Sequence, residues 1–328
     1  MVDRIMPEDA PVIFDDKHPD VVFYSVFSSD FLDYPAATRI FYTGENVRPD
    51  FNLADYAISF DHLTFGDRHL RMPEFALLEE WEHIKSRRCT NVHAQLTNRR
   101  FCNFIYSNSN ANPTRDEFFH KLNAIEPVDS LGPHLRNTDI PIGERYSQSW
   151  RSDKLKVQSH YKFSIAFENS SSPGYTTEKL VHALASDTVP IYWGDPCVAR
   201  TFNPERFIDA GELGIENAIA RVLELNQCDD AYLDMLSKPF FSEHADLDHL
   251  SRSTAKDYVE YILSLPPERR PRRNRWVWGS KYENRRKQER DALIKVSRPK
   301  LAARAIKGAK RNASKLFRAT KRGTSPKK

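Results

Sequence analysis

The stretch YKFSIAFENSSSPGYTTEKLVHALASDTVPIYWG, residues 161–194, decides the fold of this chain. It opens with apolar residues that alternate with small ones over 163–167, a pattern that predicts a β-strand. A Ser, Pro and Gly loop follows at 170–174, and the threonines at 176–177 open a helix with an acidic residue in its first turn. A second apolar strand occupies 188–193. The order predicts a βαβ unit, and in open α/β sheets ligands bind where such a loop leaves its strand.

Similar patterns on both sides of this unit indicate a two-domain α/β chain. A length of 328 residues suggests two domains, and a hydrophobic content of 40% is sufficient for their cores. We expect a first domain at 1–98, a second at 99–267 and a tail at 268–328. No first strand is evident before Pro19, so we expect it to be missing or divergent. The expected strands are 20–27, 39–42, 56–60 and 101–106, and the expected helices are 113–125, 215–225, 230–236 and 250–265.

Composition and motifs exclude several classes of protein. The four cysteines form no CxxC pair and show no metal-ligand spacing with histidine, which favours reduced thiols in a cytosolic protein. The N-terminal residues show no secretory signal, and no run approaches the ~18 apolar residues of a membrane span. P-loop, GxGxxG, GxSxG and HExxH motifs do not occur.

The net charge of +4 hides a strong asymmetry. Residues 269–328 contain 23 Lys and Arg against 3 Asp and Glu, whereas the rest of the chain contains 26 and 42. Helical spacing over 300–318 places basic residues on one face and apolar residues on the other. This pattern favours a helix that lies on an anionic membrane, although the same charge could bind nucleic acid or keep a disordered tail in solution.

Side chains around the central loop suggest an anionic ligand. Lys179 can meet a phosphate as a point charge, Asn169 can donate to an anionic oxygen, and Glu178 can accept from sugar hydroxyls. Arg115 lies in the first turn of an expected helix, a position that disfavours a cation unless an anion binds there too. From the residues alone we expect a nucleotide or phosphate ligand in an α/β crevice, with solvated first-turn residues as the plainer alternative.

The motifs FSIAFENS, GYTTEKLVHAL and TVPIYWG resemble the signature of the α-1,3-fucosyltransferases, glycosyltransferase family 10. The resemblance continues at 202–208, at 107–115 and in the turn at 41–46, and the stretch 55–71 is similar to the bacterial branch. It covers roughly residues 20–265. It implies a GT-B fold, in which two Rossmann-like domains face each other across a cleft.

The resemblance also implies the reaction. We expect inverting transfer of fucose from GDP-fucose, without a cofactor or metal, to a GlcNAc-type hydroxyl of an N-acetyllactosamine-type glycan, through an α-1,3 or α-1,4 linkage. Lipopolysaccharide or another surface glycan, including protein-linked glycans, would carry the acceptor. By similarity Glu45 is the base that deprotonates the acceptor, and Glu178 lies near the ribose or the oxocarbenium-like fucose.

The remaining site residues are assigned by the same resemblance. Arg115 and Lys179 match the cations that hold the diphosphate, and Asn169 and Tyr175 match donor-binding positions. Arg136 is a candidate for the nucleotide pocket. The loop at 170–173 differs from those of the bacterial members, which leaves its contacts open.

Bacterial members of the family tend to carry a basic amphipathic C-terminal tail. We therefore expect a cytoplasmic enzyme that binds the anionic inner face of the membrane through residues 269–328 and does not bind nucleic acid. Two alternatives remain. One is a GT-B transferase that uses another nucleotide sugar, and the other is a non-catalytic protein that binds nucleic acid or membranes through the basic tail.

Overall fold

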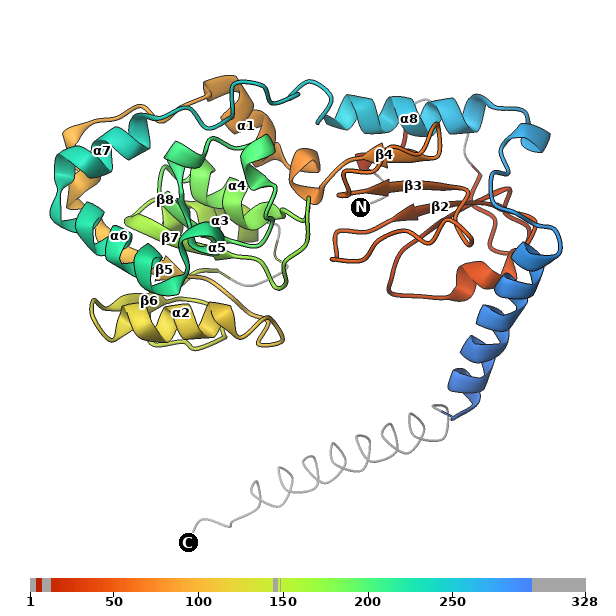
Figure 1. The fold of residues 1–328 in the computed structure, drawn as a ribbon, viewed down its shortest axis with the longest axis horizontal. Helices are drawn as coiled ribbons and strands as arrows, with labels where there is room; N and C mark the ends of the chain where they lie inside the picture. Colours follow the sequence, from red (N-terminus) through yellow and green to blue (C-terminus); the bar gives the residue numbers. More distant parts are fainter. Residues whose placement is uncertain (1–3, 8–12, 144–146, 148, 297–328) are drawn as a thin grey trace, which may run out of the picture.

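Two parallel β-sheets organise the computed structural model, which describes residues 4–7, 13–143, 147 and 149–296 (Figure 1). The first sheet consists of β1 (Val21–Tyr24), β2 (Thr38–Tyr42), β3 (Tyr56–Ser59) and β4 (His69–Arg71), and the second of β5 (Arg100–Phe104), β6 (Val128–Ser130), β7 (Tyr161–Phe167), β8 (Val189–Trp193) and β9 (Ile208–Asp209). The helices are α1 (Glu79–Arg87), α2 (Thr114–Asn123), α3 (Trp150–Gln158), α4 (Glu178–Ala185), α5 (Ala210–Leu213), α6 (Ile215–Gln227), α7 (Asp229–Ser237) and α8 (Arg252–Ser264). The elements expected from the sequence are present, with ends shifted by a few residues.

The first sheet follows the chain in the order β1-β2-β3-β4, and every pairing is parallel. All residues of β2 and β3 are buried. Burial of both faces is typical of a parallel sheet, and it explains why these strands read as continuous apolar runs. The loops after β2, β3 and β4 consequently leave the sheet at one edge.

The second sheet is also parallel, in the order β6-β5-β7-β8-β9. From β5 the chain passes to β6 on one side and then returns to β7 on the other. The strand order therefore reverses between β5 and β7, and the carboxyl ends of these two strands form the crevice where doubly wound sheets bind ligands. The motif at residues 161–194 lies on β7, α4 and β8, next to this crevice.

Segments of each half pack against the other half. Helix α1, which follows the first sheet in sequence, lies against α4 of the second. Helix α8 returns to the first sheet, where Ile262 packs against Ile40 and Tyr56. Figure 1 shows α8 along the first sheet, although the sequence suggested a second domain that continues to residue 267. The domain boundaries at 98 and 267 stay predictions, and α1 and α8 each pack against the half that these boundaries assign to the other domain.

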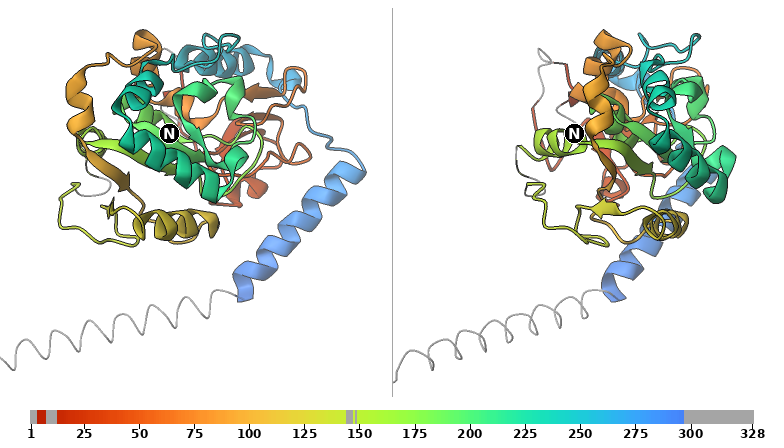
Figure 2. Two further views of the ribbon diagram at one scale, coloured as in Figure 1. Left: turned by 60° about the vertical axis from the view of Figure 1, so that its left-hand side comes forward. Right: turned by 90° about the vertical axis from the view of Figure 1, so that its left-hand side faces the viewer.

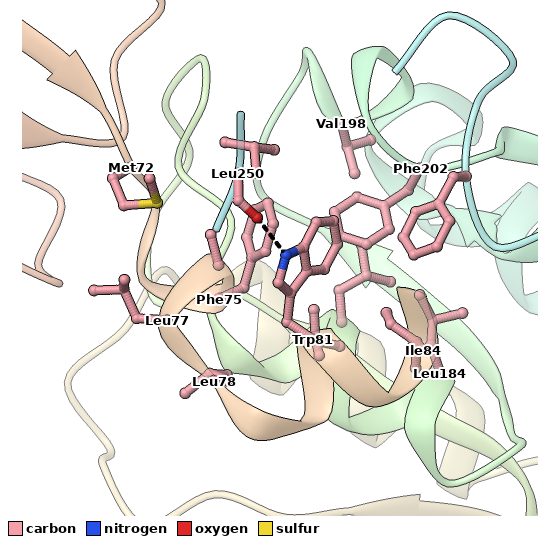
Figure 3. Close-up of a cluster of buried hydrophobic side chains, with 14 of the residues drawn as sticks. Met72, Phe75, Leu77, Leu78, Trp81, Ile84, Leu184, Val198, Phe202 and Leu250 are labelled. Carbon is pink, nitrogen blue, oxygen red and sulfur yellow. Dashed lines mark hydrogen bonds between the residues drawn. The ribbon is translucent and has the colours of Figure 1, made fainter. Parts of the chain in front are cut away.

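Trp81 of α1 is at the centre of a buried cluster that joins the two halves (Figure 3). Its indole Nε1 donates to the backbone oxygen of Leu250 at 2.7 Å. Phe202, from the second half, packs edge-on against its ring, and Phe75, from the first half, packs against it at a tilt. This shared core fixes the two facing strand edges relative to each other.

The segment after α8 continues along the first sheet. Arg273 and Asp55 form a fully buried ion pair, and Arg39 pairs with Glu283 at 2.5 Å. Residues 278–296 form a helix that extends away from the body (Figure 2). Some of the basic residues at 269–296 thus stabilise the fold through ion pairs with the first sheet. The amphipathic pattern at 300–318 lies outside the described residues. Among the described helices, none is long and apolar enough to cross a membrane.

Candidate functional site

A buried carboxylate organises the loop between β7 and α4. Glu168 follows β7, is inaccessible to solvent, and accepts from the backbone nitrogen of Thr177 at 2.8 Å and from its hydroxyl at 2.7 Å. Thr177 is the expected N-cap residue, but its side chain does not cap α4; Glu168 satisfies this helix end instead. The sequence pattern alone did not assign a role to Glu168.

Lys179 is anchored to the same carboxylate. Its Nζ lies 3.1 Å from Glu168 Oε2, 2.9 Å from the Thr177 hydroxyl and 3.4 Å from Glu178. Burial lowers the pKa of Lys179, but the charges of Glu168 and Glu178 outweigh burial and hold it well above its usual range. The ammonium group is therefore a fixed positive charge at the carboxyl end of β7.

Arg115 lies in the first turn of α2, beside the carboxyl ends of β5 and β7. Its side chain is fully buried, donates to Asn169 Oδ1 at 3.3 Å and to the backbone oxygen of Asn108 at 2.7 Å, and covers the ring of Tyr106. Burial raises the pKa of the Tyr106 phenol above its usual range, although the nearby charges of Lys179 and Arg115 both act to lower it. Two cations expected to hold a diphosphate thus converge at the switch point.

The loop after β7 also contacts the first half. Asn46 donates to the hydroxyl of Ser170 at 2.8 Å, and the buried ring of Tyr175 packs edge-on against Phe60 at 5.2 Å. Gly174 has a φ of +86°, and a Cβ there would lie 2.5 Å from the backbone oxygen of Phe60, so only glycine fits this close approach. These contacts bring the carboxyl edges of the two sheets together.

Two glutamates reach this junction from the first sheet. Glu45 is exposed in the turn after β2, and Glu74 follows β4, with Oε2 3.0 Å from where a Cβ on Gly44 would lie. The side chain of Glu74 has no hydrogen bond or ion pair with any other described residue. Burial, together with the charge of Glu178, raises the pKa of Glu74 to about 7. Sequence reasoning missed Glu74, although its place directly after a strand matched that of Glu45.

Glu178 occupies the first turn of α4 and is about one third exposed. Burial raises the pKa of its carboxyl, but the charges of Lys179 and Lys154 outweigh it and hold the pKa below the usual range. Glu178 is therefore an ionised acceptor beside the fixed ammonium group. Its position at the start of α4, where its charge acts on Glu74, suits contact with sugar hydroxyls.

Arg136 is the one predicted site residue that the structure does not bring to this cluster. Its guanidinium donates to the backbone oxygens of Leu131 and Ile140 and so holds its own loop. That loop is connected to the cluster indirectly, because His134 hydrogen-bonds Asp116, the neighbour of Arg115. Within the described ranges, no group of His, Cys, Asp and Glu is arranged to hold a metal ion; the absence of a metal stays an expectation.

Comparisons with known proteins identify the family and the fold. The model of the α-(1,3)-fucosyltransferase N-terminal domain matches residues 1–78, and that of the C-terminal domain of glycosyltransferase family 10 matches residues 96–237. A crystal structure of an α1,3-fucosyltransferase superimposes with a TM-score of 0.62 at 32% identity, covering 75% of this chain and 78% of the other. The chain belongs to glycosyltransferase family 10. The same match confirms the expected GT-B fold.

Relatives of this family-10 chain include an α-(1,3)-fucosyltransferase of Helicobacter pylori, 38% identical over 251 residues, which are 66% of this chain and 50% of the relative. A fucosyltransferase of Acanthamoeba polyphaga mimivirus is 27% identical over 64% of this chain and 35% of its own length. A further solved structure, an α1,3-fucosyltransferase with GDP-fucose, is 32% identical with a TM-score of 0.59 and covers 75% of this chain and 78% of the other. The chain spans half or less of the length of these two curated relatives.

Proposed function

We propose that this protein transfers fucose from GDP-fucose to a GlcNAc-type hydroxyl of an N-acetyllactosamine-type glycan, with inversion at the anomeric carbon. The observation that carries the proposal is the convergence of Arg115, Asn169 and Lys179 at the switch point of the second sheet. A helix terminus, the buried guanidinium of Arg115 and the partly exposed ammonium group of Lys179 at this place suit a diphosphate. Similarity to a fucosyltransferase solved with GDP-fucose supports the choice of donor.

The reaction is a single displacement. The acceptor oxygen attacks the anomeric carbon of fucose as the bond from that carbon to the β-phosphate oxygen breaks, and its electron pair leaves with GDP. Arg115 and Lys179 stabilise the charge that grows on the diphosphate, which replaces electrostatically what a metal would supply. A phosphate oxygen would displace Glu178, the most distant of the three partners of Lys179.

The proton of the acceptor hydroxyl passes to Glu45. This carboxylate is exposed at the edge of the first sheet, opposite the donor loop that carries Asn169 and Tyr175. A general base must come within hydrogen-bond distance of the hydroxyl it deprotonates, so the bound acceptor has to lie between the two sheet edges. Glu178, on the donor side, accepts from the ribose or stabilises the fucose as positive charge develops.

Radiolabelled donors test this function directly. The protein is incubated with N-acetyllactosamine and either GDP-fucose or a UDP-sugar, and the product linkage is determined by NMR. Transfer of fucose to the GlcNAc unit is expected. Transfer from a UDP-sugar but not from GDP-fucose would support the alternative of a different GT-B transferase.

We further propose that the enzyme works in the cytoplasm on lipopolysaccharide or another surface glycan, bound to the inner membrane through its basic C-terminal residues. Trp276 and Trp278 support this, because their side chains are 81% and 73% exposed beside basic residues, as in interfacial anchors. Nucleic acid is the less favoured partner of this surface.

Liposome flotation tests membrane binding, and the structure decides which deletion to use. Removal of residues 269–328 would take away Arg273 and leave Asp55 buried without its partner, so the deletion should begin at 297. Flotation with anionic but not neutral vesicles is expected for the full chain, and weaker flotation for the shortened one. Equal recovery of the full and shortened chains with anionic vesicles, with no loss after Trp276→Ala and Trp278→Ala, would contradict the proposal. Salt-sensitive DNA binding would favour the nucleic-acid alternative.

A further inference from the structure

A cavity of about 910 Å³ extends from the proposed reaction centre along α4. Its walls are α1 with the short turn before it, α3, and α4 itself. Glu74 and Glu178 line the end nearest the junction of the two sheets, and Ala185 lines the other. The cavity therefore continues from the two carboxylates that face the donor cations into a groove between the halves.

The charges of the groove suit a neutral ligand. Four glutamates line it, against two arginines, Arg4 and Arg151. Even with Glu74 partly protonated at neutral pH, an excess of negative charge remains, which disfavours a phosphate. Ionised carboxylates accept hydrogen bonds but cannot donate them, and the hydroxyl groups of a neutral sugar are matching donors. Charge thus separates this groove from the cationic diphosphate site at Arg115 and Lys179.

Glu80 provides a second observation that points to a ligand. This residue of α1 is only 8% exposed, lines the groove, and its Oε2 has no hydrogen-bond partner. Nearby His182 is 3% exposed, its Nε2 is also without a partner, and the ring lies 3.9 Å from Glu80 Oε1. Buried polar atoms are rarely left unpaired, because an unpaired one costs about 1–3 kcal/mol. A hydroxyl group of a sugar in the groove would satisfy the carboxylate once the Glu80 side chain turns toward it.

Trp150 supplies an aromatic surface to the same groove. It is partly buried, opens α3 and packs against the cluster of Leu131, Ile142 and Tyr161. A ring fixed in this way can cover the C–H face of a pyranose, while the carboxylates across the groove bind its hydroxyls. A hydrophobic ring combined with a few acceptors is the lining that a neutral saccharide requires.

We propose that this groove is the acceptor subsite, which binds a neutral saccharide through Trp150 and Glu80. It presents the reacting hydroxyl at the end marked by Glu178 and by Glu74, which lies against Gly44 beside the proposed base Glu45. The inference rests on the proposed fucosyl transfer, because it supplies the second substrate of that reaction. It assigns acceptor recognition to α1 and α3, and among the described residues these helices form no hydrogen bond or ion pair with Arg115 or Lys179.

Steady-state kinetics with two isosteric or truncating variants test this assignment. Glu80→Gln and Trp150→Ala are each expected to raise the KM for N-acetyllactosamine about tenfold. The reason is that the first loses one charge-assisted hydrogen bond and the second loses one aromatic contact. The KM for GDP-fucose should not change. Glu82→Gln is the matched control, since Glu82 lies on the same helix but outside the groove, paired with Lys85.

A binding measurement separates failure of the subsite from failure of the proposed function. Saturation-transfer NMR between the full chain with GDP and N-acetyllactosamine should give a signal that Glu80→Gln and Trp150→Ala weaken, and Glu82→Gln leaves unchanged. The thermal midpoints of all variants show that the proteins are folded. Transfer by the wild type with an unchanged acceptor KM in both groove variants overturns the subsite alone. Absence of both transfer and saccharide binding in the wild type overturns both proposals.

Discussion

Asn46 Nδ2 donates a hydrogen bond of 2.8 Å to Ser170 Oγ, and this bond joins loops that are 124 residues apart in sequence. Asn46 follows Glu45 in the turn after β2, and Ser170 follows Asn169 in the loop after β7. The bond therefore holds the proposed base and the proposed donor site at adjacent positions. Because the two sites lie on different sheets, their alignment depends on contacts of this kind.

Loss of this bond should weaken turnover more than stability. Ser170→Ala is expected to lower kcat about two- to tenfold, which corresponds to the 0.5–1.5 kcal/mol of one hydrogen bond, while GDP affinity and the thermal midpoint stay near those of the wild type. Ser171→Ala is the control, because Ser171 is exposed on the same loop. Equal kinetics of the two variants would show that the bond does not align the sites.

Glu45→Gln should separate catalysis from binding. The amide keeps the shape of the side chain but cannot accept the proton, so kcat should fall by at least the ~10²-fold typical of a lost general base. GDP affinity, measured by calorimetry, should not change, since the described contacts of the cation pair do not involve Glu45. A variant with unchanged turnover would remove Glu45 from this role.

Lys179 should have two separable roles. Lys179→Ala removes a charge from the proposed diphosphate site and also leaves Glu168 buried without its partner, a defect that typically costs about 3–5 kcal/mol. The double variant Lys179→Ala with Glu168→Gln should recover much of the lost thermal stability. GDP affinity should stay low in both. Recovery of GDP binding together with stability would mean that Lys179 acts only through Glu168.

Arg115→Ala should also lower GDP affinity, but this substitution disturbs the structure as well. The guanidinium is buried and holds Asn169 and the backbone of Asn108, so its removal should loosen the donor loop as well as remove a charge. Arg115→Lys keeps the charge without the fork that makes both bonds. An intermediate GDP affinity for Arg115→Lys, between those of the wild type and the alanine variant, is therefore expected.

The sequence predicted those parts of the molecule whose signals are local. Apolar residues that alternate with small ones predicted β7, and the apolar run at 188–193 predicted β8. The family motif assigned Lys179 and Asn169 to one site. Strand order, which places β5 next to β7 and so brings Arg115 to that loop, depends on long-range pairing and could be expected only through the resemblance.

Features that depend on tertiary contacts were missed for a physical reason. Arg273 lies in a basic run that resembles a solvated tail, yet it is buried against Asp55, more than 200 residues earlier in the chain. Glu80 looks like an ordinary exposed glutamate in the acidic first turn of a helix. Its burial arises because α1 packs against α4, and no local pattern records that contact.

Glu74 provides a pH-dependent test of the junction between the sheets. Its pKa rises from 4.5 to about 7 on folding, so the folded protein binds the proton more tightly than the unfolded chain. The associated stability is fully present below pH 4.5 and is lost as the pH rises through 7. By pH 8 the ionised carboxylate destabilises the fold by on the order of 3 kcal/mol, since each pKa unit is worth about 1.4 kcal/mol.

Glu74→Gln should remove this loss because the amide does not ionise. The difference in thermal midpoint between variant and wild type should be small at pH 5 and should grow to several degrees in favour of the variant at pH 8. Glu82→Gln, the same change on a half-exposed side chain, should show no such trend. A parallel pH dependence for wild type and Glu74→Gln would mean that Glu74 ionises near its ordinary pKa. In that case its carboxylate would be solvated rather than enclosed between Gly44 and the donor-side charges of Glu178 and Lys179.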